Sequence, residues 1–260
     1  MECLPTVSAI VLNYRTPQDT VRCVRALLGQ TVEIIVVDNH SEDDSIGVIR
    51  NTFKDEPRVK ILEAGRNRGF AHGNNMGERR AEGAYILIIN PDNELERGSL
   101  EKMVAAMEAD PSIGILGPQL VHADGTIRDS YRTFPTLSDL LIKRTMLRTL
   151  FKQRMRRYLQ HGVDPSLVRD VDWLAGACLL LRRDLYEQLG GFDTRFFLFF
   201  EDTDFCRRAW GSGRRVVYFP HARATDRKHR LSEGGLLTLF TKRTVRIHLQ
   251  SAFKYFWKWS

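Results

Sequence analysis

Asparagine and aspartate side chains recur where four apolar runs of this 260-residue chain end. The ends read Asn13-Tyr14-Arg15, Asp38-Asn39-His40-Ser41, G-R-N-R-G-F at 65–70, and Asn90-Pro91-Asp92. Amides and carboxylates of this kind can hold a nucleotide whose diphosphate is bound to a metal ion. Asn and Asp also favour turns and helix caps, which accounts for about half of such occurrences. Neither the G-x-G-x-x-G nor the G-x-x-x-x-G-K-[ST] motif is present, so a dinucleotide or P-loop site is not expected.

A second group of candidate residues lies in the C-terminal half, where F-F-L-F-F at 196–200 directly precedes E-D-T-D at 201–204. Three carboxylates at the start of a helix can simply be charges that favour its N-terminal dipole. An aromatic wall beside a carboxylate also raises the pKa of a general base toward neutrality. The segment is therefore a candidate for proton transfer.

The elements that must position these residues alternate between strands and helices. Apolar, β-branched runs predict strands at 7–12, 32–37, 59–62, 85–89, 113–116 and 215–219. Helical patterns between the first five of them cover 17–28, 43–53, 74–81 and 100–108. Strands that are apolar on both faces and separated by helices predict an α/β fold with a mostly parallel central sheet and helices on both faces. Ligands of such sheets bind at the carboxyl ends of the strands, which is where the polar residues lie.

Several segments together resemble the family 2 inverting glycosyltransferases, in particular their rhamnosyltransferase-like branch. They are V-S-A-I-V-L-N-Y, I-I-V-V-D-N-H-S, N-R-G-F-A-H-G-N-N-M-G, I-I-N-P-D, W-L-A-G-A-C-L-L-L-R-R, G-G-F-D and F-F-E-D-T-D-F-C-R-R, in the family's order and over almost the whole chain. The resemblance implies a nucleotide-diphosphosugar transferase fold, in agreement with the alternation of strands and helices. It also implies inverting, metal-dependent sugar transfer onto a lipid-linked glycan in bacterial surface polysaccharide synthesis, with L-rhamnose from dTDP-L-rhamnose as the expected donor.

The same resemblance assigns roles on the donor side. Asp92 would bind Mg²⁺ or Mn²⁺ bridging the donor diphosphate, and Asn90 is a neutral variant of the first position in that segment. Asp38 would bind the nucleobase or the ribose of the donor, in a crevice that Asn13 and Asn39 also line. The nucleotide would be approached by the loop of Asn67 and Gly69, and the helix that follows would begin at Gly73, Asn74 and Asn75, where its N-terminus could favour a negatively charged group.

On the acceptor side, the resemblance makes Asp202 the base that removes the proton of the acceptor hydroxyl. Glu201 and Asp204 would support Asp202 or bind the acceptor, and the small Gly176 would let the acceptor approach the sheet. Many relatives have a metal-binding His a few residues beyond the position of Pro220. This chain has Asp226 there, which can also bind a hard cation, and His221 and His229 lie close to it in sequence.

The net charge of +7 is concentrated in two segments. Seven basic residues lie in 140–160 and five in 234–260, without any acid in either. In the second segment Val245, Leu249, Ala252, Phe256 and Trp259 recur at helical spacing, which predicts an amphipathic helix. We expect both segments to bind an anionic membrane surface. Alternatively, the apolar side chains of both basic segments pack on the protein, and the basic side chains are merely solvated.

These patterns divide the chain into a nucleotide-sugar-binding half at 1–120 and an acceptor-binding, catalytic half at 121–232. The second half has a basic helical insertion at about 137–160, and a basic amphipathic helix follows at 233–260. The absence of a signal-peptide pattern, of a long apolar run and of paired cysteines predicts a cytoplasmic protein, peripheral on the inner face of the cell membrane.

The expected partners are a nucleotide-sugar donor, a lipid-linked saccharide acceptor and the membrane surface, with no nucleic acid. The same chemistry with a UDP- or GDP-sugar remains an alternative, as does a nucleotide-sugar-binding protein without turnover. A basic RNA-binding protein is a third possibility, but no nucleic-acid-binding motif accompanies the charge.

Overall fold

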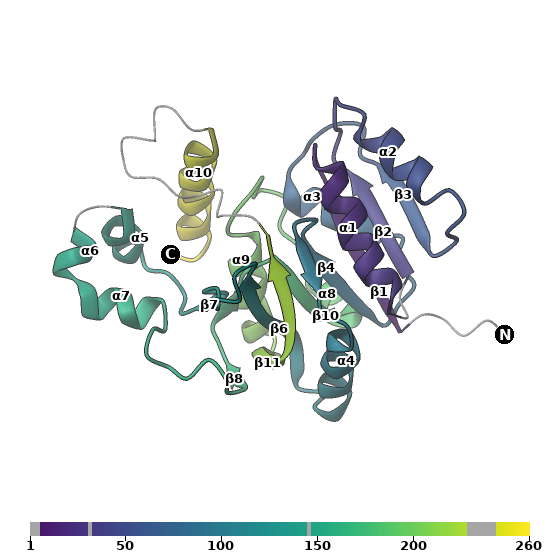
Figure 1. The fold of residues 1–260 in the computed structure, drawn as a ribbon. Helices are drawn as coiled ribbons and strands as arrows, with labels where there is room; N and C mark the ends of the chain where they lie inside the picture. Colours follow the sequence, from purple (N-terminus) through teal and green to yellow (C-terminus); the bar gives the residue numbers. More distant parts are fainter. Residues whose placement is uncertain (1–5, 31–32, 145–146, 228–242) are drawn as a thin grey trace.

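The computed structural model describes residues 6–30, 33–144, 147–227 and 243–260, and its centre is a mixed β-sheet (Figure 1). Within the described residues the strand order is β3–β2–β1–β4–β10–β6–β11–β5, with β8 beside β11 and a separate β7–β9 pair. The strands are β1 (Val7–Asn13), β2 (Glu33–Asp38), β3 (Val59–Glu63), β4 (Tyr85–Ile89), β5 (Asn93–Leu95), β6 (Ile113–His122), β7 (Tyr131–Arg132), β8 (Arg169–Asp170), β9 (Trp173–Leu174), β10 (Cys178–Arg182) and β11 (Arg215–Asp226).

Strand β10 interrupts an otherwise mostly parallel sheet, since β6 and β11 run in the same direction as β1 to β4. Strands β3, β2, β1 and β4 are parallel, as predicted, whereas β10 is antiparallel to both β4 and β6. Because β10 runs the opposite way, its N-terminal end lies at the same edge as the carboxyl ends of β1, β2 and β4. The residues just before β10 therefore join the crevice at those strand ends.

Helices cover both faces of the sheet, which confirms the predicted fold class (Figure 1). They are α1 (Pro17–Leu28), α2 (Ser45–Thr52), α3 (Phe70–Glu78), α4 (Ser99–Ala109), α5 (Leu137–Arg144), α6 (Leu147–Leu150), α7 (Lys152–Tyr158), α8 (Arg183–Gln188), α9 (Glu201–Gly211) and α10 (Arg243–Lys258). In β1, Ala9 and Val11 belong to the core under α1, α2 and α4, while Ile10 belongs to the core under α3, α8 and α9. This alternation along a strand buried on both faces explains its continuous apolar sequence.

Helix α3 begins at Phe70, four residues before the predicted start. Gly69, with a φ of 94°, ends the preceding loop and allows the chain to enter the helix there. Gly73, Asn74 and Asn75 are consequently buried inside the helix, and Asn75 contacts Tyr186 and Phe192. The expectation that they form an anion-binding helix N-terminus is therefore wrong.

The predicted C-terminal amphipathic helix is present as α10, but its apolar stripe is not available to a membrane. Val245 and Ala252 are buried and, together with the half-buried Phe256 and Trp259, lie on the side of α10 that packs against the protein. Ala252, Phe256 and Trp259 share a cluster with Phe196 and Phe200, which precede α9, and with Leu140 of α5. Figure 1 shows α10 in yellow beside α5. Four of the five residues of the expected membrane-facing stripe thus belong to an internal packing surface, and only Leu249, 38% exposed, does not.

In the described part of the chain, no helix is both long enough and apolar enough to cross a bilayer.

Candidate active site

The first part of the site is a hydrogen-bonded pair at the ends of β1 and β2. Asn13 and Asp38 are register partners in the sheet, and the Asn13 Nδ2 donates to Asp38 Oδ1 over 2.6 Å. Asp38 Oδ2 accepts from the backbone N–H of Ser41 at 2.9 Å. Both Asn13 and Asp38 are buried, and their bonds fix the turn that follows β2. The structure thus brings these two predicted residues together as a rigid, anionic end of the crevice.

A second loop carries the predicted residues Asn67 and Gly69 to this pair. Asn39 Nδ2 donates to Asn67 Oδ1 at 3.0 Å, and the same oxygen accepts the backbone N–H of Gly69 at 2.9 Å. Asn39 Oδ1 is buried without a hydrogen-bond partner among the described residues, so its capacity to accept a hydrogen bond is unused. The backbone N–H of Phe70 donates to Phe197 O at 2.7 Å, which joins this loop to the aromatic segment before α9.

Asp202 lies in the first turn of α9, beside the residues that lead into β10. Its Oδ2 accepts the backbone N–H of Gly176 at 2.9 Å, and its Oδ1 accepts that of Thr203 at 2.7 Å. Burial raises the pKa of Asp202, although these hydrogen bonds and the positive charge of Arg132 oppose the rise. The carboxylate is therefore held in a fixed orientation in a desolvated site, as a general base requires.

The backbone before Asp202 is held in an uncommon conformation. Phe199 and Phe200 both have a φ of 70°, in the left-handed region that bulky residues rarely adopt. The burial of Phe196 and Phe200 against α10 maintains this geometry. Such conformations persist only where the surrounding packing enforces them, and they occur often at active sites.

Gly176 makes a contact that the sequence did not predict. Its backbone N–H donates to Asp202 Oδ2 and orients the carboxylate. A Cβ at this position would lie 3.4 Å from Asp202 Cβ and 3.7 Å from Phe70 Cε1, which are ordinary van der Waals distances. That Gly176 leaves room for the acceptor stays a prediction.

The two carboxylates that flank this position are buried and differ from Asp202 in their surroundings. Burial, followed by the adjacent Asp202 charge, raises the pKa of Glu201 well above its usual value. Asp204 pairs with Arg208 at 2.8 Å and with Lys258 of α10 at 2.7 Å, and it accepts a 2.9 Å hydrogen bond from Trp259 Nε1. These contacts occupy Asp204 in fastening α10 to α9, so its predicted contact with the acceptor lacks support in the geometry.

The predicted metal-binding residues lie near one another at the edge formed by β5 and β11. Asp226 pairs in register with Asn93, and the backbone N–H of Arg227 donates to Asp92 O at 3.1 Å. The half-buried Asp92 accepts a hydrogen bond from Asn93 and has no ion pair with any described residue, so its carboxylate fits a divalent cation. Asp226, by contrast, is buried in an ion pair with Arg128, and this neutralised carboxylate does not fit the metal role.

The structure shows less about the other residues that were expected near this carboxylate. Asn90 is at the sheet edge, where its backbone N–H donates to Ala177 O at 2.9 Å. His229 lies outside the described residues. No group of three His, Cys, Asp or Glu side chains arranged to hold a metal occurs in the part of the chain that the structure describes.

Arg132 is a residue that the sequence did not identify as part of the site. It follows Tyr131 in β7, lies 5.3 Å from the ring centre of Trp173, and hydrogen-bonds Tyr158 of α7. Its charge acts on Asp202 and opposes the rise of the Asp202 pKa. A single arginine in a two-residue strand carries no signal in the sequence, because only the β7–β9 pairing brings it to the site.

Comparisons with known proteins agree with this architecture. Residues 8–190 match the family model described as Glycosyl transferase family 2. The chain is 32% identical over 213 residues to the N-acetylglucosaminyl-diphospho-decaprenol L-rhamnosyltransferase of Mycobacterium tuberculosis, covering 76% of this chain and 67% of that protein. It is also 26% identical over 256 residues to the rhamnosyltransferase WbbL of Escherichia coli, covering 86% and 92% of the two chains.

Two solved structures share the fold over nearly the whole chain. The mannosyltransferase PcManGT of Pyrobaculum calidifontis, in complex with GDP-Man and Mn²⁺, superposes with a TM-score of 0.63 at 20% identity. GalNAc-T7 with UDP, GalNAc and Mn²⁺ gives a TM-score of 0.67 at 15% identity. They match 98% and 96% of this chain, which spans 65% and 48% of theirs. From the family match, the relatives and the shared fold, we conclude that the chain is a glycosyltransferase and belongs to glycosyltransferase family 2.

Proposed function

We propose that this protein transfers L-rhamnose from dTDP-L-rhamnose to a lipid-linked saccharide with inversion at the anomeric carbon, and that Asp202 is the catalytic base. The position of Asp202 carries the proposal. It is a partly buried carboxylate held by Gly176 beside the crevice at the strand ends. The donor and acceptor classes are taken from the rhamnosyltransferases to which the chain is similar.

The reaction would be a single displacement. Asp202 takes the proton of the acceptor hydroxyl as the hydroxyl oxygen forms a bond to the anomeric carbon. The bond between that carbon and the diphosphate oxygen breaks at the same time, and the nucleoside diphosphate leaves with the bonding electrons. Asp38, Asn13 and Asn39 would hold the nucleoside part of the donor at the ends of β1 and β2.

Asp92 would hold Mg²⁺ or Mn²⁺ when the donor binds, because it is the predicted ligand without a charged partner among the described residues. A cation there would offset the negative charge that develops on the leaving diphosphate.

We place the enzyme at the surface of the membrane that carries its acceptor. The outer face of α10 supports this location, since Phe253 and Trp257 are 70% and 75% exposed and stack with their ring centres 6.3 Å apart. Arg243 and Arg246 are exposed on the same helix. Aromatic side chains beside bases, without acids, fit an anionic lipid interface.

The substitution Asp202→Asn tests the proposed base, because it keeps the shape of the side chain and removes its basicity. We expect kcat to fall about 10²- to 10⁴-fold with a GlcNAc-diphospho-lipid acceptor, while donor affinity measured by calorimetry stays unchanged. Asp184→Asn is a matched control on α8, where the carboxylate is exposed. Near-native turnover by the Asp202→Asn variant would contradict the assignment.

The same assay separates the alternatives. Faster transfer from a UDP- or GDP-sugar would replace the proposed donor, and donor binding without any turnover by the wild type would indicate a binding protein. An RNA-binding protein would instead bind RNA with an affinity that falls steeply with salt.

A further inference from the structure

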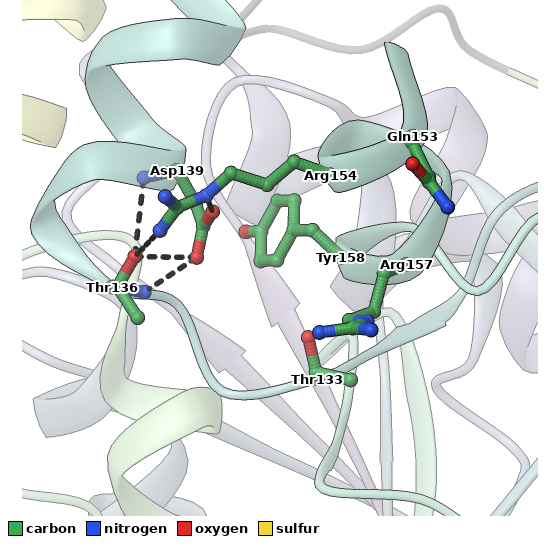
Figure 2. A pocket seen from close by; sticks show the side chains of 7 residues that line it. All are labelled: Thr133, Thr136, Asp139, Gln153, Arg154, Arg157 and Tyr158. Carbon is green, nitrogen blue, oxygen red and sulfur yellow. Dashed lines mark hydrogen bonds and ion pairs between the residues drawn. The ribbon is translucent and has the colours of Figure 1, made fainter. Parts of the chain in front are cut away.

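A cavity of about 640 Å³ lies beside α7, within the basic insertion (Figure 2). The residues that line it come from the segment after β7 and from α5 and α7, and the stems of their polar side chains make most of its surface apolar: Thr133, Thr136, Asp139, Gln153, Arg154, Arg157 and Tyr158. The volume is in the range of small-ligand sites. The proposed reaction leaves this cavity without a role.

The cavity has surplus positive charge. Arg154 Nε pairs with Asp139 Oδ1 at 2.7 Å, and its Nη2 donates to Thr136 Oγ1 at 3.0 Å, so these two charges offset each other (Figure 2). Arg157 lines the same cavity and has no ion-pair or hydrogen-bond partner for its side chain among the described residues. An exposed guanidinium beside hydroxyl groups is a suitable site for a phosphate group, which accepts several of its hydrogen bonds.

One wall of the cavity is continuous with the support of the proposed base. The backbone N–H of Thr133 donates to Tyr158 O at 3.2 Å, and the preceding Arg132 pairs in register with Trp173. Three residues after Trp173, Gly176 donates its backbone N–H to Asp202.

The electrostatics agree with this proximity. Burial raises the pKa of Tyr158, the nearby Arg132 opposes the rise, and the charge of Asp202 adds to it. The Tyr158 side of the cavity therefore lies within the electrostatic range of Asp202.

We propose that this cavity binds the diphosphate of the lipid-linked acceptor, with Arg157 as its main anion contact. The inference deepens the proposed function and rests on it for the class of acceptor. In a monosaccharide-diphospho-lipid only one sugar ring separates the attacking hydroxyl from the first phosphate. The diphosphate would then lie about one sugar length from Asp202, and the backbone contacts from Gly176 through β9 and β7 to Thr133 connect Asp202 with the cavity.

Arg157→Gln is the test, and Arg156→Gln is its matched control. Both arginines are exposed on α7, but only Arg157 lines the cavity. The probe is a short-chain, water-soluble GlcNAc-diphospho-lipid, whose affinity is measured by calorimetry without turnover. We expect Arg157→Gln to weaken this affinity about 10- to 100-fold, as loss of a charged hydrogen bond does. Arg156→Gln should leave it unchanged, and donor affinity should be the same in all three proteins.

An uncharged alkyl GlcNAc glycoside distinguishes diphosphate recognition from a general change of the site, because the wild type and Arg157→Gln should bind it equally. Unchanged affinity of Arg157→Gln for the diphospho-lipid, or equal losses for both probes, would overturn the proposal. So would a loss confined to vesicles of anionic phospholipid, which would assign Arg157 to membrane headgroups. If the diphospho-lipid result holds but the wild type transfers no rhamnose, the proposed donor reaction fails and the cavity assignment stands.

Discussion

Glu201 and Asp202 are neighbours in one helical turn, and burial raises the pKa of both, but only Asp202 has hydrogen bonds that oppose the rise strongly. Asp202 receives backbone hydrogen bonds from Gly176 and Thr203, which favour its charged form and oppose the effect of burial. Glu201 Oε2 is buried without a partner among the described residues, and burial raises the pKa of this carboxyl well above its usual value. A neutral Glu201 beside Asp202 also spares the base a second adjacent negative charge.

Glu201→Gln should therefore stabilise the protein at neutral pH. The folded state holds this proton more tightly than the unfolded state does, so the stability of the wild type falls as pH rises from about 4.5 through the raised pKa of Glu201. The glutamine amide cannot ionise, so the variant does not lose this part of its stability as the pH rises. Each tenfold difference in proton affinity is worth about 1.4 kcal/mol, or about 2–4 °C in Tm for a chain of this size.

Thermal denaturation at pH 4 and pH 8 measures the effect, with Glu101→Gln as control because Glu101 is exposed in the first turn of α4. A gain at pH 8 that disappears at pH 4 is expected for Glu201→Gln only. A Tm difference independent of pH would show that Glu201 is not the buried acid described.

How well single residues could be predicted depended on where their partners lie. Asn13 and Asp38 stand at the ends of adjacent parallel strands, so the strand pattern alone brought them together. Asp204 and Asp226 form ion pairs with Lys258 and Arg128, which are distant in sequence, and no local pattern reveals such pairs. These two carboxylates look alike in the sequence and differ from Asp92 only in the folded protein.

At the scale of elements, the contact between the 65–70 loop and the aromatic segment before α9 joins the two halves of the site. A Cβ on Gly69 would overlap the carbonyl oxygen of Phe197, and the φ of 94° disfavours any other residue. Gly65 of the same loop also has a positive φ, of 67°, but open space around it.

Gly69→Ala should consequently cost about 3 kcal/mol or more of unfolding free energy, and Gly65→Ala about 1 kcal/mol. Transfer activity should fall further in Gly69→Ala, since the overlap separates the donor loop from the segment that carries Asp202. Urea denaturation and kinetics of the two variants check this. Equal effects of both substitutions would mean that backbone conformation alone, and not the contact with Phe197, requires glycine at 69.

The bounds of helices and strands could be predicted where local periodicity sets them, and not where a distant contact such as that of Phe197 does. Helix α1 and strand β4 have the predicted bounds, because their apolar periodicity is determined by the sheet that they build. The start of α3 was wrong by four residues, since it is set by Phe197, far away in the chain. For α10, helical periodicity identified the apolar stripe but could not tell whether lipid or protein covers it.

At the scale of the whole molecule, the outer face of α10 is the surface that we expect to meet the membrane. The double substitution Phe253→Ser/Trp257→Ser should abolish co-sedimentation with anionic vesicles, because interfacial binding depends on apolar area together with charge. The control Ile127→Ser/Leu167→Ser removes two side chains that are exposed elsewhere, 48% and 58% respectively. Equal recovery of both double variants with the vesicles would show that the outer face of α10 does not bind the membrane. Strong binding to neutral vesicles would show that the basic side chains are not needed for it.

The contacts of Lys258 and Trp259 also determine how the protein responds to shortening at this end. Both side chains reach Asp204, and Lys258 additionally pairs with Asp193 at 2.8 Å. A variant truncated after Trp257 would leave Asp204 buried with Arg208 as its remaining charged partner among the described residues. The turn that carries Asp202 would lose its support before any apolar residue of the outer face was cut. Loss of activity after C-terminal trimming would therefore report on damage to the catalytic turn and not on detachment from lipid.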